Sequence, residues 1–148
     1  CGDARLNDYD MINAVGRGVD TTTAISRLLF SGHFLKYSGM TMVLSHGGGA
    51  IPYMMGRLER NCAIHPGEYA SAADGFRRLY FDSVLFDPAT LAFLVGKVGA
   101  GRVVLGSDYP FPIGDLAPCK IIQAGAFSET DRRLILGETA KRLFRLEE

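Results

Sequence analysis

The sequence predicts an α/β fold built around a parallel sheet, and three observations support this prediction. Three short apolar runs have the length of buried strands, and stretches with helical spacing of apolar residues separate them. Their order, in which helices and strands alternate, is typical of right-handed β-α-β units. The composition is 47% hydrophobic and 22% charged, which is enough apolar material for a real core. Parallel strands are therefore expected to end at one edge of a shared sheet.

The first helix and the first strand are predicted by their apolar patterns. Apolar residues recur at helical spacing over residues 19–34, and Gly32 suits the end of that helix. Residues 41–45 then form an almost continuous apolar run between glycines, as expected of a strand buried on both faces. This strand ends at His46.

The middle of the chain predicts two helices and a second strand. One helix is expected over residues 51–61, and a shorter one over residues 68–77 after the Pro66-Gly67 break. Residues 79–86 are rich in aromatic and β-branched side chains, which favours a strand.

The last part of the chain predicts a helix, a third strand and a closing helix. The Asp87-Pro88 step suits a helix cap and first turn, and Gly99 suits the end of that helix. Residues 102–106 form the third predicted strand. A closing helix is expected over residues 128–136, where Gly137 would break it before a final amphipathic turn.

Composition and charge narrow the classes of function. Sixteen basic residues balance sixteen acidic residues without long runs of either sign, which indicates neither a nucleic-acid partner nor a membrane partner. A small molecule is the expected partner. The three cysteines are widely spaced and odd in number, so neither a disulfide framework nor a zinc knuckle is indicated, and a reducing, cytoplasmic setting is expected.

The start of the sequence predicts that further chain precedes it. The first residue is Cys1 rather than methionine, and the polar residues that follow are typical of the middle of a loop. Three predicted strands are also too few for a closed eight-stranded barrel, which takes about 250 residues, or for most open doubly wound sheets.

Two of the three predicted strands lead directly into a side chain suited to catalysis. His46 follows the first strand and Asp108 follows the third, and the carboxyl ends of parallel strands line the active site in α/β folds. A histidine there can transfer protons, and an aspartate can bind a divalent metal. Taken singly, each residue has a structural alternative: His46 could be a hydrogen-bonded core residue and Asp108 a turn cap. Because both occur at strand ends of one sheet, a functional site is favoured over these structural alternatives.

Three glycines, Gly47, Gly48 and Gly49, follow His46 directly. Without side chains they leave room for a substrate to approach the backbone, and their amides precede a helix N-terminus suited to an anion. A phosphate-binding turn is the alternative, although the run matches neither G-x-G-x-x-G nor a lysine-bearing P-loop.

Three blocks of sequence carry a family resemblance. They are Ser45 to Ala50 with Gly56-Arg57, Tyr80-Phe81-Asp82-Ser83 with Asp87-Pro88, and Val104 to Pro112. Together they resemble the amidohydrolase-related family that includes aminocarboxymuconate-semialdehyde decarboxylase. This resemblance implies a metal-dependent (β/α)8 TIM barrel, of which residues 1–148 would be the C-terminal part, about strands six to eight with their helices.

The resemblance also implies roles for particular residues. The family binds one divalent metal, usually zinc, through a His-x-His pair on the first strand, a histidine on the fifth and an aspartate on the eighth. Asp108 matches that aspartate, and His46 matches the histidine that exchanges protons with the metal-bound water. Arg57 matches an arginine that helps to hold the substrate carboxylate, in relatives across a dimer interface; a solvated surface residue is the alternative for Arg57. Gly47 and Gly48 would border the substrate. A homodimer is therefore expected for the full-length protein.

The chain departs from the family pattern in its histidines. It contains no His-x-His pair, and neither His33 nor His65 matches the fifth-strand ligand. The other ligands are therefore expected upstream, and these residues alone should bind metal poorly and show no turnover. For the full-length protein, the resemblance implies decarboxylation of an unsaturated or aromatic carboxylic acid. Hydrolysis of a C–O, C–N or C–C bond by the same apparatus is the alternative.

Two other interpretations compete with that of a metal-dependent decarboxylase or hydrolase. The His-Gly-Gly-Gly run also occurs in the oxyanion hole of serine esterases, but the G-x-S-x-G nucleophile motif of those enzymes is absent. A non-catalytic fragment that uses the exposed edge of its sheet for association is the other reading.

Overall fold

The computed structural model describes residues 3–146, and these residues form two compact units. The first unit runs to Met42 and resumes over Gly48–Leu79. The second unit takes Val43–Gly47 and the described residues from Tyr80 onward. His46 and Asp108 therefore belong to the same unit.

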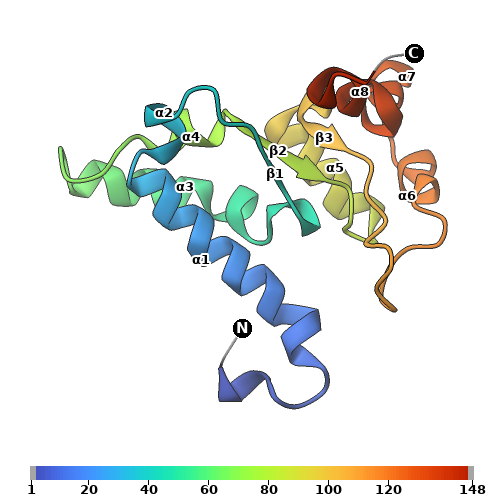
Figure 1. Cartoon of the computed structure of the whole chain (residues 1–148), viewed down its shortest axis with the longest axis horizontal. Helices are drawn as coiled ribbons and strands as arrows, with labels where there is room; N and C mark the ends of the chain where they lie inside the picture. Colours follow the sequence, from blue (N-terminus) through green and yellow to red (C-terminus); the bar gives the residue numbers. More distant parts are fainter. Residues whose placement is uncertain (1–2, 147–148) are drawn as a thin grey trace. The chain divides into compact units, whose positions relative to one another are not determined.

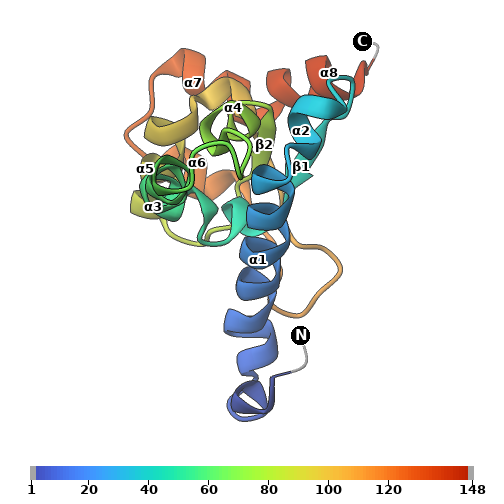
Figure 2. The same ribbon diagram turned by 90° about the vertical axis from the view of Figure 1, so that its left-hand side faces the viewer.

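The first unit is helical. Its helices are α1 (Arg17–Phe30), α2 (His33–Lys36), α3 (Ile51–Ile64) and α4 (Ala72–Phe76), after a 3-10 turn over Ala4–Leu6 and a π-helical turn over Ile12–Gly16. The π turn leads without interruption into α1, so the helical rise starts earlier than the predicted residue 19 (Figure 2). The break predicted at Gly32 is confirmed, because α1 stops at Phe30 and Gly32 adopts a left-handed φ of 72°. Residues 33 and 34, which the predicted range includes, belong to the separate helix α2.

Apolar side chains from the helices build the core of the first unit. Its buried members include Ile25, Leu29, Phe34, Ile51, Met55 and Phe76. The helix predicted for 51–61 continues to Ile64, and the one predicted for 68–77 is reduced to α4. It is short because the Ser71 side chain accepts a hydrogen bond from the Asp74 amide and so fixes the start of the helix.

The second unit contains most of a three-stranded sheet. Its strands are β1 (Met42–Leu44), β2 (Leu79–Asp82) and β3 (Val103–Val104), in the order β1-β2-β3 (Figure 1). Strands β2 and β3 run parallel, with Asp82 opposite Val104. The predicted parallel α/β arrangement is confirmed for this pair, and the two strands end at the same edge of the sheet.

The second strand ends four residues earlier than predicted. Residues 79–86 carry strand-favouring side chains, but the amide of Leu85 bonds to the carbonyl of Ser83 at 2.8 Å and closes a tight turn. Phe86 then adopts a φ of 56°, which no strand accommodates. The chain therefore leaves the sheet directly after Asp82.

Helix α5 (Pro88–Val98) follows, and both of its predicted ends are confirmed. The Asp87 carboxylate accepts a hydrogen bond of 2.7 Å from the amide of Thr90, and Gly99 has a φ of 84°. A 3-10 turn over Ala100–Arg102 takes the first residue of the third predicted strand. Strand β3 also ends at Val104, two residues before the predicted end.

The last helices differ from the prediction in two respects. Helix α6 (Cys119–Ala124) is not predicted from the sequence; it is less than two turns long and buries Ile121 and Ile122. At the end of the chain, α7 (Glu129–Arg133) passes through a π-helical turn over Leu134–Glu138 into α8 (Thr139–Phe144). The predicted break at Gly137 is wrong, because the wider turn continues the helical hydrogen bonding and keeps Ile135 and Thr139 fully buried.

Two of the three cysteines lie in the described part of the chain. Cys62 and Cys119 are free thiols, whereas Cys1 lies outside the described residues. Between residues 3 and 146, no helix combines the length and the apolar character that crossing a membrane requires.

Candidate functional site

The backbone holds both predicted site residues in an uncommon conformation. His46 has a φ of 54° and Asp108 has a φ of 59°, both in the left-handed region. Few residues other than glycine occupy this region, although histidine and aspartate tolerate it better than most. Such strain persists only where the surroundings fix it, and it concentrates at functional sites.

The two side chains lie next to each other in the second unit. Nε2 of His46 is 3.7 Å from Oδ1 of Asp108, which is within ion-pair range but too long for a hydrogen bond. The His46 side chain is 35% exposed and the Asp108 side chain 18% exposed, so both can be reached by a small molecule. The structure thus brings together an imidazole that can carry a proton and a carboxylate that can bind a cation.

A third acidic residue, Asp82, stands at the end of the middle strand. Its Oδ1 accepts hydrogen bonds from the amides of Gly47, at 2.9 Å, and Val84, at 3.1 Å. Burial raises the pKa of the Asp82 carboxyl above its usual value, although the amides of Gly47, Val84 and His46 favour its ionised form. The sequence prediction assigns no role to Asp82, and its only signal in the sequence is a carboxylate within the otherwise largely apolar run 79–86.

Ser83, the next residue, makes a corresponding contact with the chain that leads to Asp108. Its side chain is buried, with 2% of the residue exposed, and its Oγ accepts a hydrogen bond of 3.1 Å from the amide of Gly106. A Cβ at Gly106 would lie 2.8 Å from the Val84 side chain and 3.1 Å from that of Asp82. Glycine is therefore required for this close approach.

Backbone hydrogen bonds close the loop that follows Asp108. The carbonyl of Asp108 accepts from the amide of Phe111 at 3.0 Å, and the carbonyl of Ser107 accepts from the amide of Asp115 at 2.7 Å. Gly114 completes the loop, since a Cβ there would lie 2.9 Å from the carbonyl oxygens of Phe111 and Ser107. The loop thus fixes the backbone of Asp108 from its C-terminal side.

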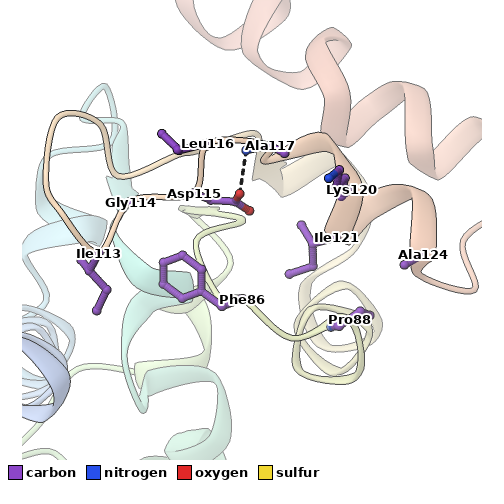
Figure 3. Close-up of a pocket in the computed structure, with 10 residues that line it drawn as sticks. All are labelled: Phe86, Pro88, Ile113, Gly114, Asp115, Leu116, Ala117, Lys120, Ile121 and Ala124. Carbon is purple, nitrogen blue, oxygen red and sulfur yellow. Dashed lines mark hydrogen bonds between the residues drawn. The ribbon is translucent and has the colours of Figure 1, made fainter.

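This loop also borders a hollow of about 460 Å³ in the second unit. Its lining is mostly apolar and comes from Phe86, Pro88, loop residues 113–117 and helix α6, including Ile121 (Figure 3). The Asp115 carboxylate accepts a hydrogen bond of 2.7 Å from the amide of Ala117, drawn dashed in Figure 3. Neither His46 nor Asp108 lines the hollow, so chemistry is assigned to the His46–Asp108 pair and not to this space.

The three glycines after His46 all have a positive φ, of 59°, 82° and 60° in order. The amide of Gly47 is already bonded to Asp82, and the amide of Ala50 is bonded to Oγ1 of Thr22 at 2.9 Å. At Gly49, a Cβ would lie 2.7 Å from the carbonyl oxygen of Gly18. Packing of the protein itself therefore accounts for much of the glycine requirement, and the anion expected at this turn would not find the Gly47 amide free.

Replacing Gly47 by alanine should destabilise the second unit by about 1 to 3 kcal/mol. The added Cβ would be held at a φ of 59° and would meet Cδ2 of Leu85 at 2.7 Å. Gly96→Ala is the matched control: its Cβ would meet nothing within 4 Å in helix α5, so it should stabilise by about 0.5 to 1 kcal/mol. Urea unfolding of both variants measures the difference, and equal effects would contradict this account of the turn.

The other predicted residues lie in the first unit. Arg57 is on the exposed side of α3, and Gly48 begins the second stretch of this unit. His33 contacts Oγ of Ser31 at 2.6 Å, and His65 is paired with Glu68 at 3.4 Å. Within residues 3–146, no group of three or more His, Cys, Asp or Glu side chains is arranged to hold a metal ion.

Comparisons with known proteins agree on one family. A sequence model described as amidohydrolase matches residues 4–146. The 2-amino-3-carboxymuconate-6-semialdehyde decarboxylase of Dictyostelium discoideum is 34% identical, and the match covers 94% of this chain but 40% of that protein. The crystal structure of 5-carboxyvanillate decarboxylase from Sphingomonas paucimobilis superposes with a TM-score of 0.85 at 28% identity, over 98% of this chain and 46% of that one.

A further solved structure contains a metal ion. The dihydroxybenzoic acid decarboxylase of Polaromonas sp. JS666, with bound manganese and the inhibitor 2-nitroresorcinol, has a TM-score of 0.78 at 29% identity, over 88% of this chain and 41% of that one. The chain thus spans less than half the length of each of these three proteins.

Proposed function

The chain belongs to the amidohydrolase family, and from this premise we propose that it forms part of a metal-dependent carboxy-lyase. The proposed reaction is the decarboxylation of an aromatic or unsaturated carboxylic acid, as in the relatives named above. The observation that carries the proposal is the pairing of His46 and Asp108, whose side chains approach to 3.7 Å in the loops that follow β1 and β3. This pairing supports the proposal that a proton carrier acts beside a metal ligand.

Asp108 fits one part of a metal site. Its carboxylate is accessible and suits a divalent cation, but residues 3–146 do not complete a ligand set, so further ligands would come from elsewhere in the full-length protein. A bound divalent metal would act as a Lewis acid toward the substrate. Zinc remains the ion that we propose, and manganese in the Polaromonas relative is the alternative.

His46 would supply the proton that the reaction consumes. When the bond between the substrate carbon and its carboxylate breaks, the electron pair stays on that carbon, which must then be protonated. Nε2 of His46 faces Asp108 and is the ring atom proposed to hold and deliver this proton. Arg57, with its permanent positive charge, and the glycines Gly47 and Gly48 are proposed to bind the substrate, on the strength of the family resemblance.

The architecture of the full-length protein is part of the same proposal. The described residues would form about strands six to eight of a (β/α)8 barrel, and residues 1–148 would be the C-terminal part of that single domain. The lengths of the relatives support this, because the chain matches less than half of each. A homodimer in the cytoplasm is the proposed setting.

Removing the metal from the full-length protein should abolish its activity. We expect a chelator to stop carbon dioxide release from aromatic carboxylic acids, and we expect readdition of Zn²⁺ or Mn²⁺ to restore it. Carbon dioxide release and elemental analysis measured on the same samples would test this. Activity that persists after the metal has been stripped would contradict the metal-dependent mechanism.

A further inference from the structure

We propose that Asp82 and Ser83 are positioning residues for the two halves of the site, Asp82 for His46 and Ser83 for Asp108. The inference rests on the proposed function for its catalytic consequence, but its structural part is independent of the reaction. The two residues are adjacent at the end of the middle strand, β2, and each accepts a hydrogen bond from the chain beside a different site residue.

Asp82 acts on the turn that carries His46. A single carboxylate oxygen accepts from the Gly47 amide and from the Val84 amide, so it links the turn after β1 to the end of β2. The turn has positive φ values at both His46 and Gly47, and few residues other than glycine keep such a conformation without support from surrounding contacts. The buried carboxylate supplies the contact that holds it, because charged acceptors form the stronger hydrogen bonds.

Ser83 acts on the segment that leads to Asp108. Its buried Oγ accepts from the amide of Gly106, two residues before Asp108, and the missing side chain at Gly106 permits this approach. Asp108 itself has a positive φ, and the loop behind it is closed by its own hydrogen bonds. Ser83 therefore fixes the backbone on the N-terminal side of Asp108, and the loop hydrogen bonds fix it on the C-terminal side.

The division between the two residues predicts separable effects. Loss of the Asp82 contact should displace His46 and so impair proton transfer, whereas Asp108 keeps its own support. Loss of the Ser83 contact should loosen Asp108 and so weaken metal binding, whereas the contact between Asp82 and the His46 turn remains. Residues that orient a metal ligand commonly change metal affinity by 10-fold to 100-fold when they are replaced.

The experiment compares Asp82→Ala, Asp82→Asn and Ser83→Ala in the full-length protein, with Ser128→Ala as a matched control. Ser128 caps helix α7, so its loss should lower stability without disturbing the site. Amide hydrogen exchange is followed in peptides containing Gly47 and Gly106, together with metal affinity, kcat and KM.

Asp82→Ala should accelerate exchange at Gly47 and lower kcat at least about 10-fold, with metal affinity retained. Asp82→Asn keeps an acceptor oxygen and should recover most of this loss. Ser83→Ala should accelerate exchange at Gly106 and weaken metal affinity about 10-fold to 100-fold, with kcat restored by excess metal. Ser128→Ala should leave kcat, metal affinity and the exchange at Gly47 and Gly106 unchanged.

Several outcomes would overturn the inference. If amide exchange at Gly47 is unchanged in Asp82→Ala, or exchange at Gly106 is unchanged in Ser83→Ala, the corresponding side chain does not hold that backbone segment. Asp82→Asn as impaired in kcat as Asp82→Ala would assign Asp82 a direct chemical role through its charge. If the wild-type protein decarboxylates nothing, the proposed function fails, but the exchange measurements still decide whether the two contacts hold the turns.

Discussion

Replacing His46 by asparagine should lower kcat by about 100-fold to 10,000-fold while the bound metal stays unchanged. Asparagine tolerates the left-handed region, so the φ of 54° at this position can persist in the variant. The amide side chain cannot carry a proton at neutral pH, and this removes the group proposed to protonate the substrate carbon. The loss corresponds to about 3 to 5 kcal/mol of transition-state stabilisation.

The measurement pairs steady-state kinetics with elemental analysis of the purified full-length variant. His65→Asn is the matched control, because His65 lies in the first unit, where it is paired with the surface residue Glu68 and lies against the ring of Tyr69. It should retain wild-type kcat. If His46→Asn instead loses its metal, His46 would be a ligand and the division of roles with Asp108 would be wrong.

The sequence was informative about His46 and Asp108 because each follows an apolar run. A run of strand length marks where a parallel strand ends, and the carboxyl ends of such strands share one edge of the sheet. The proximity of the two side chains in the structure follows from this rule. Their chemical roles do not follow from it and stay predictions.

Asp82 and Ser83 could not be assigned in the same way. Residues 79–86 have a composition that favours a strand throughout, so the sequence placed both residues inside β2 rather than at its end. The position of the strand end depends on the turn at Leu85 and on the amides of Gly47 and Gly106. Two of these three partners are distant in sequence, and local patterns carry no information about such contacts.

Helix boundaries are also predictable only where residues close in sequence determine them. The side-chain cap at Asp87 and the end of α5 at Gly99 were predictable, because capping depends on residues within one turn. The continuation of the last helix through Gly137 was not, because glycine has a low helix propensity and the burial of Ile135 and Thr139 outweighs it.

Replacing Asp108 by asparagine should deplete the full-length protein of its metal and lower kcat/KM by at least about 100-fold. Asparagine preserves the size of the side chain and tolerates the φ of 59°, so the loop that follows should keep its hydrogen bonds. What changes is the charge, because a neutral amide is a much weaker ligand than a carboxylate for a divalent cation. Elemental analysis and titration with Zn²⁺ and Mn²⁺ give the affinity directly.

Asp87→Asn is the matched control for Asp108→Asn. It tests whether removing any carboxylate from the second unit lowers the metal content, or only removing the proposed ligand. Asp87 caps helix α5 through the amide of Thr90, and asparagine caps helices as well as aspartate does, so this variant should keep its fold and its metal. Excess metal should restore part of the activity of Asp108→Asn if the carboxylate acts only as a ligand. Full metal occupancy in Asp108→Asn would mean that the carboxylate serves the turn rather than the cation, and the proton chemistry of His46 would then need a different electrostatic partner.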